Sequence, residues 1–238
     1  MRSIVPGAPA VAVLILLTAA GASAEFNGNI GLTNNYIWRG VTQSDGKPSF
    51  QGGVGYTFSP GFYLSLGCAS VHRAVGIEED ETGVRIQDAP YLETEWVVGF
   101  KKELFKHWRV DLSVLKDIYP AFGSENYPEA NLEVTYRFLN LLLAFSNDLY
   151  NTNTNGAYYA LGFDHEFKYK IRLHGHGGHF IQRAEPEIGN YSDYDIGVGW
   201  KFAGVGLDLS AAGTHDRNTT DNKTHDRMHL IVSVSKEF

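Results

Sequence analysis

The feature that most constrains the fold of this chain is a two-residue alternation of apolar and polar side chains, which recurs along almost its whole length. In one such stretch Leu132 and Val134 alternate with Glu133 and Thr135. Because successive side chains of a strand point to opposite faces, this period places the two sets on opposite faces of a sheet. No stretch shows a comparable stripe at the 3.6-residue period of a helix. The pattern predicts about 12 strands of roughly 9–11 residues each, the length with which a tilted strand crosses a bilayer.

Alternation alone does not decide which face is buried, because a soluble sandwich or a lipocalin-like barrel shows the same pattern with its apolar face inside. The connections favour a membrane barrel, since they alternate between short and long, as periplasmic turns and extracellular loops do. Short turns are predicted at residues 59–61, 101–107, 139–140, 165–168 and 203–204. Longer loops are predicted around residues 42–48, 72–89, 119–130, 150–156, 178–192 and 215–226.

Aromatic side chains gather near the predicted ends of the apolar face. Amphipathic rings prefer the headgroup level, so two aromatic belts are expected of a lipid-facing surface. The belt at the short-turn end is predicted to hold Phe58, Phe62, Phe100, Trp108, Phe138, Phe167, Tyr169, Trp200 and Phe202. Tyr36, Trp38 and Tyr194 are predicted near the opposite end. Cross-strand aromatic pairing in a soluble sheet is the alternative interpretation.

The chain ends in an alternating segment that runs from Leu230 to Phe238. A strand at the chain terminus must pair with the first strand or leave an exposed edge, so the pattern favours a closed sheet. A last strand with a terminal Phe resembles the signal that outer-membrane assembly machinery reads. We therefore expect that machinery to be a partner of the chain through Phe238.

Residues 1–24 are predicted to be a signal peptide. Arg2 precedes an apolar stretch that is short for a transmembrane helix and ends in Ala22-Ser23-Ala24, a small-x-small cleavage pattern. An uncleaved N-terminal anchor is the alternative. Residues 25–238 are then predicted to form one all-β domain, a closed antiparallel transmembrane β-barrel in the outer membrane of a Gram-negative bacterium. Cys68 is the only cysteine, which excludes an internal disulfide.

A nine-residue run from Tyr36 to Ser44, YIWRGVTQS, resembles the aromatic-x-aromatic-Arg-Gly-x-Ser/Thr-x-Ser signature of the TorF-like family of small proteobacterial porins. Weaker points of similarity are Gly52-Gly53, Gly61-Phe62-Tyr63, Tyr119-Pro120 and Phe238. The chain departs from the family pattern at residues 67–71, where an Asn is expected before Val71. The resemblance implies an outer-membrane location and passive transport, and it transfers no catalytic residue.

Charged side chains occur on the polar face of nearly every predicted strand. Such residues suit a water-filled or salt-bridged lumen and are costly against lipid. The residues predicted to line the lumen are Arg39, Glu93, Glu95, Arg109, Asp111, Glu133, Arg137, Asp148, Asp164, Lys170, Arg172, His174, His176, Asp193, Asp195, Lys201, Asp208, Arg227 and Glu237. Twelve strands lie between the filled bore of an eight-stranded barrel and the open channel of a large porin. Structural ion pairing is the alternative role for these side chains.

Two other groups contain residue types that are used in metal sites or catalysis. His174 and His176 share one strand face, with His179 nearby, but no carboxylate or Cys at ligand spacing completes a metal site. Thr214-His215-Asp216 and Thr224-His225-Asp226 contain residue types used by barrel proteases and lipases, but nothing in the sequence fixes a nucleophile beside a base. We therefore predict no catalytic residue, no metal and no cofactor.

The predicted function is passive diffusion of ions or small solutes through a narrow polar lumen. One alternative is a non-conducting barrel that binds a ligand or partner through its outer loops, and another is a barrel enzyme. Outer-membrane lipid and small solutes or ions are the expected partners. The formal net charge of −7 argues against nucleic acid, because no basic patch would release counterions from phosphates.

Overall fold

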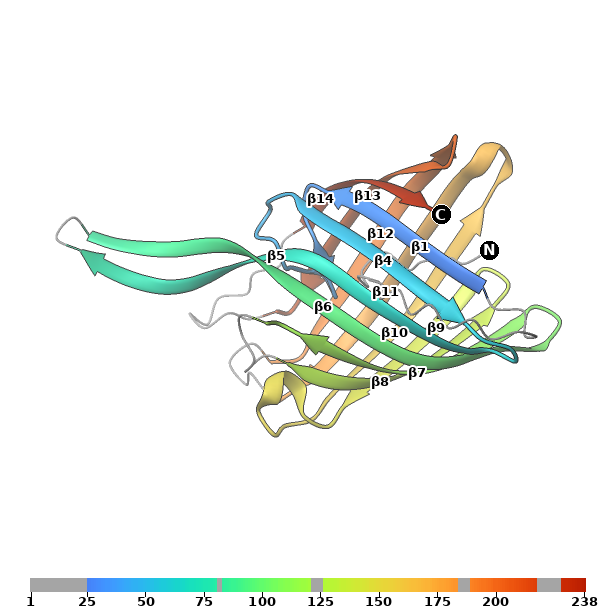
Figure 1. The fold of residues 1–238 in the computed structure, drawn as a ribbon, viewed down its shortest axis with the longest axis horizontal. Helices are drawn as coiled ribbons and strands as arrows, with labels where there is room; N and C mark the ends of the chain where they lie inside the picture. The colour runs from blue at the N-terminus through green and yellow to red at the C-terminus, as the bar shows by residue number, and fades with distance from the viewer. Residues whose placement is uncertain (1–24, 81–82, 121–125, 184–188, 218–227) are drawn as a thin grey trace.

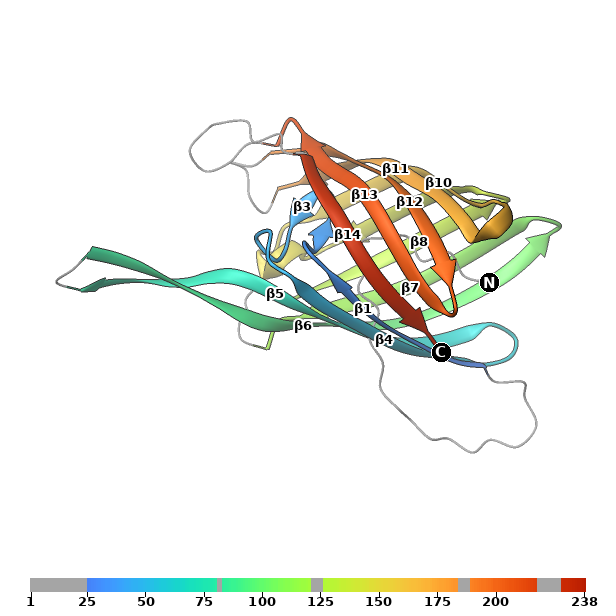
Figure 2. The same ribbon diagram turned by 90° about the horizontal axis from the view of Figure 1, so that it is seen from above.

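The computed structural model describes residues 25–80, 83–120, 126–183, 189–217 and 228–238, without the side chains of residues 73–90. Residues 1–24, the predicted signal peptide, lie outside these ranges. The described strands form one closed antiparallel barrel (Figures 1 and 2). In chain order, the barrel strands are β1 (Glu25–Thr33), β4 (Ser49–Thr57), β5 (Phe62–Asp80), β6 (Gly83–Phe105), β7 (Trp108–Ile118), β8 (Tyr127–Tyr136), β9 (Leu139–Ser146), β10 (Gly156–Glu166), β11 (Ile171–Gln182), β12 (Tyr191–Phe202), β13 (Val205–His215) and β14 (Met228–Glu237).

Four short elements of the described residues are not part of the barrel wall. Strands β2 (Ile37–Trp38) and β3 (Val41–Thr42) pair only with each other, and two single-turn 3-10 helices, η2 (Leu149–Asn151) and η3 (Lys168–Lys170), occupy connections. Among the described residues no helix is long and apolar enough to cross a membrane.

The first and last strands pair and close the sheet. The Phe238 amide donates to the Gly28 carbonyl at 3.0 Å, and the Gly28 amide donates to the Phe238 carbonyl at 2.8 Å. These bonds extend the β1–β14 ladder to the end of the chain. Closure leaves no strand edge unpaired in the ring, so the backbone satisfies its own hydrogen bonds. The predicted fold, a closed antiparallel barrel of 12 strands, is confirmed.

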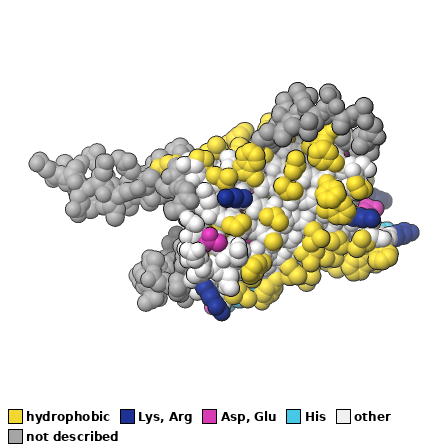
Figure 3. Space-filling view, turned by 60° about the horizontal axis from the view of Figure 1, so that its bottom comes forward, with side chains coloured by type: hydrophobic (Ala, Val, Ile, Leu, Met, Phe, Trp, Pro, Cys, Tyr) yellow, Lys and Arg dark blue, Asp and Glu magenta, His cyan; other side chains and the backbone are white. Residues whose placement is uncertain are grey.

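The two faces of the sheet have opposite character, as β12 illustrates. Ile196 and Val198 are 55% and 50% exposed, whereas Asp193 and Asp195 are 3% and 8% exposed. Because the barrel wall is a single layer, buried side chains of the wall point to the interior and exposed apolar ones point outward. Figure 3 shows one outer face covered by apolar side chains, with charged side chains toward its two ends.

Apart from the connection between β5 and β6, the connections alternate in length as predicted, with small corrections to their bounds. β6 continues to Phe105, so the turn expected at residues 101–107 is only Lys106 and His107. β9 begins at Leu139, which places the next turn at Arg137 and Phe138 instead of residues 139–140. His107 and Arg137 have φ values of 72° and 54°, the left-handed backbone of tight turns.

The longest predicted loop is wrong, because residues 72–89 belong largely to paired strands. β5 and β6 continue past the barrel as a two-stranded arm, which Figures 1 and 2 show projecting from one end. Their ladder continues to Asp80 and Gly83, with one irregularity between Ala74 and Gly76.

The predicted position of Tyr36 and Trp38 in an outer aromatic belt is also wrong. β1 ends at Thr33, and the segment that follows turns into the barrel, where Tyr36 is only 2% exposed. The alternation of apolar and polar residues continues through residues 34–38 because β2 is also an extended strand, although it lies outside the barrel wall. At the short-turn end seven of the nine predicted aromatic side chains, among them Trp108 and Trp200, are exposed, and Phe58 and Phe100 are half-buried.

The outward face can be tested at Leu112 and Ser113, near the middle of β7. Leu112 is 52% exposed, and its neighbour Ser113 lies on the interior parity. If the apolar face contacts lipid, a fluorophore at position 112 is quenched by mid-chain brominated lipid and one at position 113 is not. Leu112→Arg should cost about 2–4 kcal/mol in unfolding free energy, because a charge then faces hydrocarbon. Equal quenching at both positions would contradict the orientation.

Candidate functional site: the barrel interior

The segment between β1 and β4 forms a hairpin inside the barrel. Strands β2 and β3 pair Ile37 with Thr42 and Trp38 with Val41, which leaves Arg39 and Gly40 as the two-residue turn. Their φ values are 46° and 75°, the sign that a type I′ hairpin turn requires. Asn or Gly is usual at the first position, and a left-handed Arg costs about 1–3 kcal/mol. The Arg39 side chain must therefore make contacts that offset this cost.

The hydroxyl groups of the YIWRGVTQS run hold the base of this hairpin. The side-chain oxygen of Asn35 accepts hydrogen bonds from Thr42 Oγ1 at 2.6 Å, from Ser44 Oγ at 3.2 Å and from the Gly46 amide at 3.2 Å. The Tyr36 amide donates to Ser44 Oγ at 2.8 Å. The Ser/Thr positions of the signature are thus explained by local hydrogen bonding that fixes the loop.

Arg39 joins the tip of the hairpin to the barrel wall. Its Nη2 donates to both carboxylate oxygens of Glu129 in β8, at 2.9 and 2.7 Å. The guanidinium carbon lies 4.3 Å from the ring centroid of Trp38, 4.2 Å from that of Tyr158 in β10 and 5.0 Å from that of Phe180 in β11. The Arg39 and Glu129 side chains are 7% and 6% exposed. A desolvated ion pair surrounded by aromatic rings is the strongest polar contact of the hairpin.

Gly40 brings the hairpin against the opposite part of the wall. A Cβ at this position would lie 2.5 Å from the Gly213 carbonyl oxygen and 2.8 Å from both Asp193 Cβ and Thr214 Cγ2. The tip therefore reaches β12 and β13, while its ends continue into β1 and β4. The hairpin crosses the interior and narrows it at the long-loop end. Only glycine fits both the backbone angle and this close approach.

A group of carboxylates lies beside the hairpin on β6, β7 and β8. Glu93, Glu95, Asp117 and Glu129 are all less than 9% exposed. Glu95 and Asp117 are partners in the β6–β7 ladder, and Tyr36 Oη donates to Glu93 at 3.5 Å. Asp117 Oδ1 is buried and has no hydrogen-bond partner among the described residues. This side of the interior is strongly negative, and Arg39 is the cation that reaches it.

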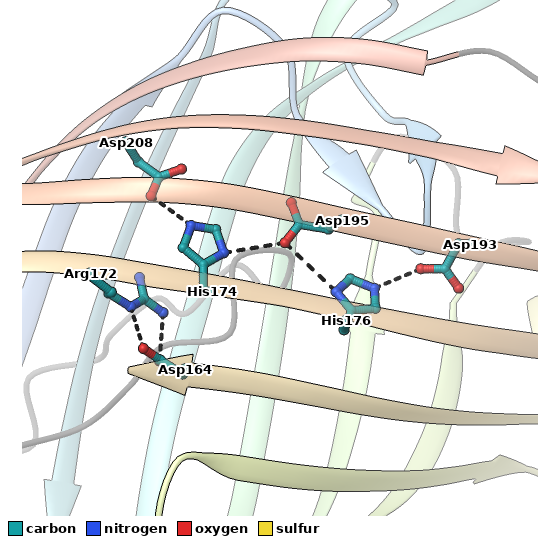
Figure 4. Close-up of polar contacts among 7 residues, drawn as sticks. All are labelled: Asp164, Arg172, His174, His176, Asp193, Asp195 and Asp208. Carbon is teal, nitrogen blue, oxygen red and sulfur yellow. Dashed lines mark hydrogen bonds and ion pairs between the residues drawn. The ribbon is translucent and has the colours of Figure 1, made fainter. Parts of the chain in front are cut away.

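Histidine and aspartate side chains alternate along the wall formed by β10 to β13 (Figure 4). His174 lies between two carboxylates, with Nδ1 3.3 Å from Asp195 Oδ1 and Nε2 2.8 Å from Asp208 Oδ2. His176 Nε2 is 2.7 Å from Asp193 Oδ2. Only an imidazolium donates from both ring nitrogens, so the geometry around His174 fits its charged form.

Two neighbours complete this row. Arg172 donates from Nε and Nη2 to the two oxygens of Asp164, at 2.7 Å each, as a bidentate pair. Gly197 leaves room for the His174 ring, because a Cβ there would lie 2.5 Å from it. The row is a continuous polar track along the inner wall (Figure 4).

The structure places most of the residues predicted for the lumen in the interior, at different depths. Arg109, Asp111 and Glu133 are half-buried toward the short-turn end, where Tyr63 Oη donates to Asp111 at 2.8 Å. The deeper members of the predicted set are Arg39, Glu93, Glu95, Asp164, Arg172, His174, His176, Asp193, Asp195 and Asp208. Their role in a conducting path remains a prediction.

Three predicted lumen residues lie in connections instead of strands, two lie at the short-turn rim, and one lies outside the described residues. Arg137 lies exposed in a turn and Lys170 lies exposed in η3, because the adjoining strands end before them. Lys201 and Glu237 form an ion pair at the short-turn rim, with side chains 43% and 52% exposed. Asp148 lies in an outer connection, where its Oδ1 accepts from the Asn153 amide at 2.7 Å. Arg227 is the residue outside the described ranges.

Sequence reasoning missed three charged residues of the interior. Asp117 continues the polar parity of Asp111 on β7, and that parity would have identified it. Glu129 was assigned to a loop, although Tyr127 begins β8. Lys101 was assigned to a turn but lies in β6, and its Nζ donates to Thr57 Oγ1 at 3.0 Å.

Among the described residues, the other candidate groups form neither a metal site nor a complete catalytic triad. No cluster of three or more His, Cys, Asp or Glu residues in the described part of the chain is arranged to hold a metal ion. His179 Nδ1 lies 3.0 Å from Ser192 Oγ. His215 and Asp216 are adjacent and more than two-thirds exposed, at 3.6 Å from each other. Residues 224–226 lie outside the described ranges.

The family comparison finds a model that matches residues 18–238, described as bacterial protein of unknown function (Gcw_chp). The chain belongs to this family. The description does not mention TorF-like porins, so that resemblance remains a prediction. A comparison with curated proteins finds no match.

Solved structures with a similar fold include two porins. The KdgM porin matches with a TM-score of 0.55 and 9% identity, over 90% of this chain and 99% of that chain. The NanC porin matches with a TM-score of 0.55 and 8% identity, over 89% of this chain and 99% of that chain. At these identities the similarity concerns the fold alone.

We predict that the ion pair between Arg39 and Glu129 holds the hairpin in the barrel interior. Removing one partner of a buried ion pair costs about 3–5 kcal/mol, so Arg39→Ala and Glu129→Gln should each release the hairpin. The measurement is iodide quenching of Trp38 in a variant whose other three tryptophans are replaced by Phe. Quenching should rise severalfold in each variant and no further in the double variant.

Lys201→Ala is the matched control for this experiment, because it removes an exposed ion pair worth about 0–1 kcal/mol. It should leave the quenching of Trp38 unchanged. Quenching that stays at the wild-type level in Arg39→Ala would show that the ion pair does not hold the hairpin.

Proposed function

We propose that this protein is an outer-membrane porin that allows passive diffusion of ions or small solutes, with the internal hairpin as its constriction. The observation that carries the proposal is the reversed polarity of the barrel. Apolar side chains cover the outside while carboxylates, histidines and arginines are buried inside. A protein in water has no reason to expose such a continuous apolar band, whereas a bilayer requires it.

The same proposal gives the predicted terminal segments a role. A signal peptide at residues 1–24 would export the chain, and assembly machinery would read the strand that ends at Phe238. Outer-membrane lipid then surrounds the apolar face. The two porins of similar fold and the resemblance to the TorF-like family support this assignment.

The alternative of a non-conducting barrel is favoured by one specific observation, the hairpin that crosses the interior. A hairpin fixed by Arg39 and Asn35 at its two ends would serve a closed, ligand-binding barrel as well as a narrow porin. Enzymatic activity has less support, because His179 contacts the Ser192 hydroxyl but no carboxylate of the described residues bonds to His179 to complete a catalytic triad.

Single-channel recording separates the two functions. We expect purified wild-type protein in a planar bilayer to conduct weakly, and Arg39→Ala to conduct several times more, because its hairpin no longer blocks the interior. Arg137→Ala is the matched control, since Arg137 lies exposed in a turn. Silence of both the wild-type and the Arg39→Ala proteins, with heat-dependent gel mobility showing folded barrels, would favour the non-conducting alternative.

The interior charges predict a preference for cations. The described interior carboxylates, Glu93, Glu95, Asp111, Asp117, Glu129, Glu133, Asp164, Asp193, Asp195 and Asp208, outnumber the arginine and lysine side chains there. Fixed negative charge raises the local concentration of cations. The reversal potential in a salt gradient should therefore show cation selectivity.

Neutralising the carboxylates beside the hairpin should weaken this selectivity. The double variant Glu95→Gln with Asp117→Asn should shift the reversal potential toward zero. Glu103→Gln, an exposed residue near the end of β6, should leave it unchanged. Anion selectivity of the wild-type channel would refute the assumption that these carboxylates line the path.

A further inference from the structure

The wall residues that surround the Arg39 side chain form a receptor for a guanidinium group. Glu129 supplies a carboxylate, while Tyr158 and Phe180 supply aromatic rings with centroids 4.2 and 5.0 Å from the guanidinium carbon. These residues come from β8, β10 and β11, so they belong to the barrel and remain when the hairpin leaves. We propose that this site binds guanidinium-bearing solutes, and that Arg39 occupies it as a tethered substitute ligand.

The way in which Arg39 fills the site shows that its tether restricts it. Both oxygens of Glu129 contact the same nitrogen, Nη2, instead of forming the parallel two-nitrogen fork that guanidinium and carboxylate prefer. Nη1 is buried and has no hydrogen-bond partner among the described residues. Arg39 also holds a left-handed backbone at the turn. A free guanidinium group is able to rotate into the fork and carries no such backbone strain.

A guanidinium ion fits this site better than an ammonium ion. Its planar, weakly hydrated group stacks on aromatic faces and loses less hydration in a buried site than a compact ammonium does. Tyr158 Oη donates to Asp193 Oδ2 at 3.2 Å, which restricts the orientation of the Tyr158 ring. The ring is thus positioned before a ligand arrives.

A small cavity borders the site. A small open cavity of about 40 Å³ is lined by Trp38, Phe180, Tyr191 and Arg217 among others, and it shares Trp38 and Phe180 with the site. A solute that enters there meets the aromatic edge first and Glu129 after displacement of Arg39. Because the tether keeps Arg39 at an effective concentration on the order of millimolar, a free ligand must compete at or above that concentration.

This inference deepens the proposed porin function, since it names guanidinium-bearing cations as a solute class. Its test measures binding instead of conduction, so the guanidinium site and the porin function can be refuted independently of each other. Binding of methylguanidinium to purified Arg39→Ala protein is measured by isothermal titration calorimetry, because the released hairpin carries Trp38 away from the site. We expect saturable binding in the millimolar range or tighter. The double variant Arg39→Ala with Glu129→Gln should bind at least tenfold more weakly, and methylammonium should bind at least tenfold more weakly than methylguanidinium.

The wild-type chain gives an independent measurement that needs no substitution at Arg39. Methylguanidinium should raise iodide quenching of Trp38 by displacing the hairpin, at concentrations higher than those that saturate Arg39→Ala. Methylammonium at equal concentration should not. Equal binding by the single and double variants, or equal effects of the two ions on the wild-type protein, would overturn the proposal even if the barrel conducts.

Discussion

The structure depends on the closure of one sheet on itself. A single layer of strands has no second layer against which to bury a face, and the hydrogen bonds between Gly28 and Phe238 complete the ring that replaces it. Once the ring is closed, every strand has an inside and an outside. The two-residue period then sorts side chains between two environments, so apolar residues such as Ile196 face outward and Asp195 faces inward.

The interior must solve a problem that a hydrophobic core does not have. Buried carboxylates are costly unless they meet donors or cations. On β10 to β13 the chain meets this requirement with histidines and Arg172, which alternate with the aspartates (Figure 4). On β6 to β8 the cations Lys101 and Arg109 lie toward the short-turn end, and Arg39 of the hairpin supplies the cation that contacts Glu129. The ion pair between Arg39 and Glu129 therefore both balances charge inside the barrel and fixes the position of the hairpin.

Much of the fold followed from local pattern, because strand period and turn length are properties of neighbouring residues. The order of strands, closure and the outward face of residues such as Leu112 were all accessible in this way. The hairpin was not, since Tyr36 and Trp38 keep the parity of β1 although the sheet has already ended at Thr33. A period of two marks extended backbone, and it carries no information on whether that backbone lies in the wall or inside it.

Only some residues of the candidate site could be predicted from the sequence. Arg39 stood out through its motif, and Asp193 and Asp195 through their parity, but the partner of Arg39 is 90 residues away in sequence. Glu129 looked like a loop residue because the chain around Tyr127 and Pro128 lacks a clear alternation. Contacts across the interior join strands that are not neighbours in the sheet, and neither period nor spacing encodes them.

The place of the hairpin in the chain has a consequence for how the barrel is assembled. The hairpin is tied at both ends, to β1 and to β4, and its tip reaches β12 and β13 on the far wall. The seam between β1 and β14 joins the first and last strands, the two that lie farthest apart in the sequence. An insertion that follows this seam must pass through the mouth of a finished cylinder, whereas an open sheet can curl around a hairpin already in place. A hairpin that is in place first therefore acts as an internal template, and the barrel wall closes around it.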